Sequence, residues 1–80
     1  MPFYLFHWTP SREQHLAEHG LAPEEFEEVV CDPDFVSKSR TTGRPIAFGE
    51  TSSGKYLACV YDLIDDLNVV PITAFEPDED

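Results

Sequence analysis

The apolar residues follow two different periods along the chain. Between residues 10 and 34 they recur at helical spacing, as in Phe26, Val29 and Val30, which is typical of an amphipathic helix. Between residues 35 and 75 apolar and polar residues alternate more closely, which is typical of strands. The pattern therefore predicts a helical layer followed by a sheet.

Two helices are predicted near the N-terminus, over residues 10–19 and from Pro23 to an Asp32-Pro33 stop. Thr9 can cap the first helix, and Pro10 suits its first position because the missing N–H has no helical partner there. Gly20 supplies the left-handed residue that commonly follows a helix. The two helices are therefore short and separated by a tight loop.

Five strands are predicted, over residues 2–8, 35–40, 45–51, 55–63 and 67–75. Alternation sets Phe35 on one face with Ser37, and Ile46 on one face with Phe48. The strand over 55–63 is apolar on both faces in its middle, which indicates a central position in the sheet. Pro71 cannot donate to a ladder, so it indicates an edge strand or a bulge.

The expected element order is β-α-α-β-β-β-β. Consecutive strands after the helices can meet as hairpins, so we expect a two-layer α+β domain whose mostly antiparallel sheet packs on the two N-terminal helices. Residues 1–75 form this single domain, and residues 76–80 form an acidic tail.

Charge is distributed unevenly along the chain. The net charge is −11, yet residues 36–58 contain four bases and one acid. The bases are Lys38, Arg40, Arg44 and Lys55. Either they pair with neighbouring acids, or they form a small anion-binding patch. Elsewhere the acidity disfavours non-specific binding to nucleic acid.

The two cysteines, Cys31 and Cys59, are too few for a disulfide framework. Cys59 lies in an apolar strand pattern and is expected in the core. The apolar run at residues 3–6 is too short for a secretory signal, and no apolar run is long enough to span a membrane. We therefore expect a cytoplasmic protein with free thiols.

Several short motifs follow one another along nearly the whole chain. They are Trp8, His15–Leu21 with its His-Gly end, Pro23–Val30 with Asp32-Pro33, Gly43–Gly49, Ser53–Leu57 and Val70–Ala74. In these motifs the chain resembles the BrnT family of toxins from type II toxin–antitoxin modules. The resemblance implies a RelE-like fold, a metal-independent endoribonuclease activity and an antitoxin partner.

The C-terminal segment departs from that family. Its members usually continue into a basic segment and an arginine-rich helix, whereas this chain ends Phe75-Glu76-Pro77-Asp78-Glu79-Asp80. RNA cleavage needs cations at the phosphate. The acidic end therefore favours the alternative function, a catalytically silent, acidic protein-interaction module of the same fold.

If the chain cleaves RNA, five residues are candidates for the chemistry. Arg40 and Arg44 flank one turn and can both reach a phosphate, and Lys55 adds a third cation. Tyr56 or His19 can assist proton transfer. The competing interpretation is structural: the arginines form a solvated hairpin tip, and His19 interacts with the negative end of a helix dipole.

Other kinds of site have weak support. His15 and His19 have the spacing of two metal ligands on one helix, and His7 is a third imidazole, but no complete metal motif is present. No glycine-rich phosphate loop occurs. We therefore expect no metal and no cofactor.

The expected partners are an antitoxin or another protein, and RNA if the chain is active. A curved sheet can accept a partner strand at its edge or a partner helix across its face. The acidic surface favours a basic partner, although the glutamates at 24, 25, 27 and 28 are also explained as the solvated face of a helix.

Overall fold

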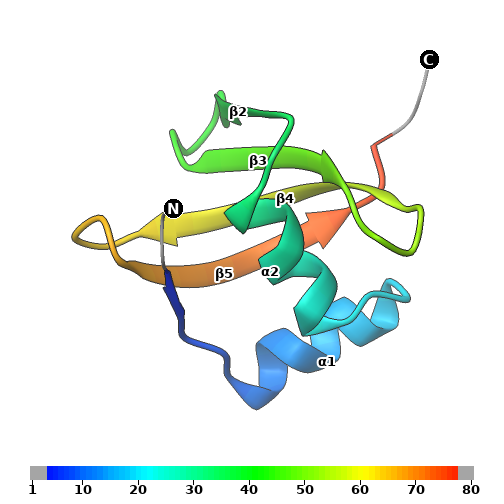
Figure 1. Cartoon of the computed structure of the whole chain (residues 1–80). Coiled ribbons are helices and arrows are strands. Elements are labelled where there is room, and N and C mark those ends of the chain that lie inside the picture. Colours follow the sequence, from blue (N-terminus) through cyan, green and yellow to red (C-terminus); the bar gives the residue numbers. More distant parts are fainter. Residues whose placement is uncertain (1–3, 78–80) are drawn as a thin grey trace.

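The computed structural model describes residues 4–77 (Figure 1). Its elements are β1 (Leu5–Phe6), α1 (Pro10–Glu18), α2 (Pro23–Cys31), β2 (Phe35–Lys38), β3 (Pro45–Glu50), β4 (Tyr56–Leu63) and β5 (Asn68–Phe75). The five strands form one mixed sheet and the helices form a second layer, which confirms the α+β class.

Helix α1 begins and ends at the predicted signals. The Thr9 hydroxyl accepts a hydrogen bond from the Arg12 N–H at 3.2 Å, and Pro10 occupies the first turn. The helix ends at Glu18, one residue earlier than expected, and His19 is its C-cap. Gly20 follows with a φ of 75°, which favours glycine because it has no Cβ.

Helix α2 also follows the predicted bounds. Its apolar stripe of Phe26, Val29 and Val30 is buried, as the spacing indicated. Asp32 caps its C-terminal end with an N–H bond to the Glu28 carbonyl oxygen at 3.1 Å. Cys31 is the last helical residue and is exposed.

The sheet has the strand order β1-β5-β4-β3-β2. Strand β4 is central, as its apolar middle predicted. The pairings from β2 to β5 are antiparallel, whereas β1 pairs with β5 in parallel. Because the chain must cross α1, α2 and three strands between β1 and β5, β1 cannot join its partner by a hairpin.

Strand β1 has two residues, whereas the sequence predicted a strand over residues 2–8. Residues 2 and 3 of that prediction lie outside the described part of the chain. Side chains alternate between the two faces over residues 4–8, as expected of an extended segment. Tyr4, Phe6 and Trp8 pack against the core, while Leu5 and His7 are exposed. The Trp8 Nε1–H also donates to a carboxylate oxygen of Glu27 at 2.7 Å.

Pro71 lies at a bulge in β5, one of its two predicted settings. Val60 pairs with Thr73 and Tyr61 pairs with Pro71, so Ile72 has no partner on β4. A guanidinium N–H of Arg12 donates to the Ile72 carbonyl oxygen at 3.1 Å. Helix α1 therefore lies against β5 beside the bulge.

The core lies between the helices and one face of the sheet. Its buried residues are Leu16, Leu21, Phe26, Val29, Val30, Ala47, Leu57, Cys59, Tyr61, Val69 and Ala74. Cys59 is fully buried as predicted, and burial raises the pKa of its thiol to about 12. Among the described residues, no helix has the length and apolarity needed to cross a membrane.

Candidate functional site

Four of the five predicted catalytic residues lie in two groups at opposite ends of β3. Arg40 and Arg44 precede this strand, in the turn from β2, while Lys55 and Tyr56 follow it, after the turn into β4. A strand rises about 3.3 Å per residue, so the six residues of β3 separate the groups by roughly 20 Å. The structure therefore does not bring all the cations to one phosphate-sized site.

The turn between β2 and β3 is held by its own polar groups. The Ser39 hydroxyl accepts from the N–H groups of Thr41 and Thr42 at 3.3 and 3.4 Å, and the Gly43 N–H donates to the Ser39 carbonyl oxygen at 2.9 Å. Arg40 is exposed in this turn. Within residues 4–77, no hydrogen bond or ion pair engages its guanidinium group.

Arg44 is engaged by an acid. Its Nε–H donates to a carboxylate oxygen of Asp62 at 2.9 Å, and both side chains are partly exposed. An ion pair at such exposure contributes little to stability, about 0–1 kcal/mol. It nevertheless neutralises part of the positive charge that an anion would meet there.

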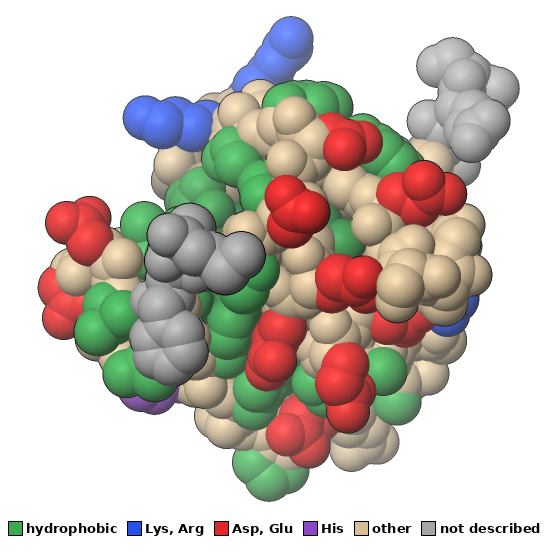
Figure 2. Space-filling view, viewed as in Figure 1, with side chains coloured by type: hydrophobic (Ala, Val, Ile, Leu, Met, Phe, Trp, Pro, Cys, Tyr) green, Lys and Arg blue, Asp and Glu red, His purple; other side chains and the backbone are tan. Residues whose placement is uncertain are grey.

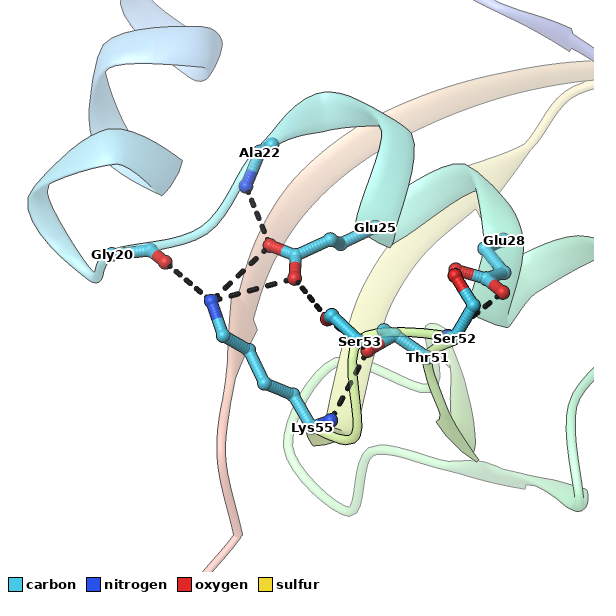
Figure 3. A network of polar contacts seen from close by, with 8 residues as sticks. All are labelled: Gly20, Ala22, Glu25, Glu28, Thr51, Ser52, Ser53 and Lys55. Carbon is cyan, nitrogen blue, oxygen red and sulfur yellow. Dashed lines mark hydrogen bonds and ion pairs between the residues drawn. The ribbon is translucent and has the colours of Figure 1, made fainter.

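Lys55 belongs to a polar network that joins two loops to α2 (Figure 3). Its Nζ donates to the Gly20 carbonyl oxygen at 2.9 Å and lies 3.4 Å from a carboxylate oxygen of Glu25. The backbone N–H of Lys55 donates to the Thr51 hydroxyl at 3.1 Å. These contacts give Lys55 a structural role between the α1–α2 loop and the β3–β4 turn.

Glu25 is the centre of the same network. One carboxylate oxygen accepts from the Ala22 N–H at 3.0 Å, and the other accepts from the Ser53 hydroxyl at 2.9 Å. Burial by itself raises the pKa of Glu25, but the hydrogen bonds from Ala22, Ser53 and Lys55 outweigh burial and lower it. The carboxylate therefore stays ionised and holds the start of α2 against the β3–β4 turn.

A second glutamate of α2 holds the same turn. The Ser52 N–H donates to a carboxylate oxygen of Glu28 at 2.9 Å, and the Ser52 hydroxyl is 3.4 Å from the other oxygen (Figure 3). Glu25 and Glu28 are one turn apart on the helix. With Glu27, which accepts from Trp8, three of the four glutamates that resembled a solvated helix face thus make tertiary contacts.

His19 and Tyr56 point to different parts of the molecule. His19 is exposed at the end of α1, and its ring packs edge-on against His15 at 5.0 Å between centroids. Tyr56 is opposite Glu50 on the sheet face away from the helices. His15 Nε2 is 2.9 Å from the Thr73 hydroxyl. Within residues 4–77, no group of three or more metal-ligating side chains could hold a metal ion.

The sheet face away from the helices carries an uncovered apolar surface, here called the open face. Directly opposed residues of antiparallel strands share a face, and the register aligns Phe35, Phe48, Ala58 and Phe75 in one row across four strands. The remaining apolar members of the open face are Leu5, Ile46, Tyr56, Val60 and Val70.

Several rings of the open face are accessible to solvent. Phe35 is 53% exposed, Phe75 is 41% exposed and Tyr56 is 38% exposed. Phe35 and Phe48 stack with 4.6 Å between centroids and 12° between planes, so each ring covers one face of the other. Alternation in the sequence paired Ile46 with Phe48, but only the sheet register joins these residues to Phe75.

Comparisons of the chain with protein-family models, curated proteins and solved structures return no match.

Proposed function

We propose that the protein is an acidic interaction module that binds a partner protein through the open face. The observation that carries this proposal is the row from Phe35 to Phe75, which crosses four strands without a covering helix. The proposal corresponds to the second of the two functions that the sequence favoured.

The composition of the open face supports binding. An antiparallel sheet with one solvated face usually presents polar side chains there. Here Phe35, Phe75 and Tyr56 are all more than a third exposed, and they lie on the same face as Ile46, Phe48 and Val60. A contiguous apolar surface rimmed by polar residues is typical of an interaction site.

Charge indicates the chemistry of the partner. The chain has a net charge of −11, and acids are spread over the helix-bearing side (Figure 2). Glu50 and Glu76 are exposed at the ends of β3 and β5, where they adjoin Tyr56 and Phe75. The occupant that fits is an apolar protein segment flanked by Lys or Arg, since opposite charges favour encounter and orientation.

A selection experiment tests this proposal. A displayed library of protein fragments is selected for binding to the wild-type chain. The selected fragments are then tested for retention on the double variant Phe35→Ser/Phe75→Ser. Leu63→Ser is the matched control, because Leu63 is also 41% exposed but pairs with Val69 on the helix-bearing face. We expect enriched fragments to combine apolar and basic residues and to be lost only on the double variant. Equal retention on all three proteins contradicts the proposal.

RNA cleavage is the second candidate function, and the observation that favours it is the exposed Arg40 beside Arg44 in one turn. On this proposal the BrnT-like chain is a metal-independent endoribonuclease of a toxin–antitoxin module, with Lys55, Tyr56 or His19 assisting. Inducible expression in bacteria, with growth and bulk RNA as readouts, tests it beside Arg40→Ala/Arg44→Ala. Growth arrest and RNA loss that both require the arginines support cleavage, whereas intact RNA and normal growth refute it.

A further inference from the structure

Strand β2 (Phe35–Lys38) is an edge of the sheet that is exposed along its whole length. It is last in the strand order, and all four of its residues are exposed. Figure 1 shows β2 on the far side of the sheet from α1, with no described element along its outer edge. Val36, on the helix-bearing face, is 51% exposed because the helices do not extend over this strand.

The hydrogen-bonding groups of β2 divide between its partner and solvent. The Ser39 N–H donates to the Arg44 carbonyl oxygen at 2.8 Å, and Lys38 is opposite Pro45, which has no N–H. Bonded and non-bonded pairs alternate in an antiparallel ladder. The backbone groups of Val36 and Lys38 therefore point away from β3 and are available to another strand.

The charges on the two sides of Val36 are opposite in sign and equally far from it. Asp34 lies two residues before Val36, and Lys38 lies two residues after it. In an antiparallel pairing of two copies centred on Val36, each Asp34 is opposite Lys38 of the other copy. The Asp34 N–H already donates to the Phe48 carbonyl oxygen at 2.7 Å, so at this position the two copies pair through their side chains. The edge is therefore complementary to itself in this register.

We propose that two copies of the chain associate by antiparallel pairing of their β2 strands about Val36. A lysine on an edge strand usually prevents such pairing, but here each copy supplies the acid that neutralises it. Residues 32–44 hold three bases and two acids in a chain of net charge −11. Two copies thus meet at a segment whose net charge is +1, three bases less two acids, and not at one of the acidic segments.

The proposed dimer has a defined architecture. Its two-fold axis is perpendicular to the sheet, so the two sheets join into one and both open faces lie on the same side. Opposite-charge pairs across strands contribute about 0.2–1 kcal/mol each, and a short edge pairing buries less than the roughly 1,200 Å² of a standard interface. The dimer is therefore weak and depends on concentration, and it does not depend on the partner proposed for the open face.

Charge exchange tests the proposal. Sedimentation is measured over a concentration series up to about 1 mM, the range in which weak complexes form. Asp34→Lys and Lys38→Asp should each weaken self-association about tenfold, because each replaces two attractive pairs with two repulsive ones. An equimolar mixture of the two variants should associate again, and the double variant D34K/K38D should self-associate like the wild type.

The register is tested by cross-linking in a Cys31→Ser background, which removes the exposed thiol at the end of α2. Val36→Cys should form an interchain disulfide on mild oxidation, whereas Ser37→Cys should not, because only residue 36 lies on the two-fold axis. Circular dichroism checks that each variant is folded. A monomeric wild type at every concentration, a failure of the mixture to associate, or cross-linking at residue 37 instead of 36 overturns the proposal.

Discussion

Replacing Glu25 with alanine should destabilise the fold far more than replacing its neighbour Glu24. Glu25 accepts hydrogen bonds from Ala22 and Ser53 and pairs with Lys55, so it connects α2 with the β3–β4 turn (Figure 3). Glu24 is exposed, and within residues 4–77 its side chain makes no hydrogen bond or ion pair. The two glutamates share the first turn of α2, so Glu24 is a matched control.

The magnitude follows from the contacts that are lost. A hydrogen bond to a charged group contributes about 1.5–3 kcal/mol when buried, and a half-exposed ion pair contributes about 0–1 kcal/mol. Water replaces part of these contacts because the site is near the surface. We therefore expect a loss of about 2 kcal/mol in the free energy of unfolding for Glu25→Ala, which corresponds to a fall in Tm of roughly 10 °C for a domain of this size.

Thermal and urea unfolding, followed by circular dichroism and Trp8 fluorescence, measure both variants. Glu24→Ala loses only its interaction with the helix dipole, about 0.3–1 kcal/mol. A double-mutant cycle between Glu25→Ala and Lys55→Met isolates the ion pair, for which we expect a coupling below about 1 kcal/mol. Equal destabilisation by Glu24→Ala and Glu25→Ala would refute the structural role of the network.

Three further outcomes follow from the structure. The stabilisation by Glu25 should be complete above its ordinary pKa of 4.5 and disappear as the pH falls through its lowered folded pKa; urea unfolding of wild type and Glu25→Gln across this range checks it, and a pH-independent difference contradicts it. A thiol reagent should label Cys31 alone in the native state, because Cys59 is buried with a pKa of about 12; counting thiols before and after unfolding tests this, and two native labels would exclude a buried Cys59. Trp8→Phe should cost about 1 kcal/mol through loss of its bond to Glu27; an unchanged urea midpoint would show that this bond adds no stability.

Local signals predicted most of the elements. Thr9, Pro10 and Gly20 set the bounds of α1 to within one residue, because caps and turns depend on neighbouring residues alone. The apolar middle of β4 indicated its central place. Pro71 left an edge and a bulge open, and the break in pairing at Ile72, between Pro71 and Thr73, shows the bulge.

Contacts between distant residues could not be predicted in this way. Lys55 was a candidate cation for RNA, but its amine bonds to Gly20 and Glu25, which are 35 and 30 residues away. The separation of Arg40 from Lys55 follows from the length of β3, while the alignment of Phe35 with Phe75 depends on the register of three strand pairs. Periodicity gives the face of each strand but not which residues are opposed.

The most direct test of partner binding by the open face is the affinity of one selected fragment for three proteins, measured by calorimetry. Removing a large apolar contact costs about 1.5–3 kcal/mol, so Phe75→Ser should weaken binding at least tenfold. Leu63→Ser, with the same exposed fraction on the other face, should bind like the wild type. Equal affinity of all three proteins, or a larger loss for Leu63→Ser than for Phe75→Ser, would contradict binding at the open face.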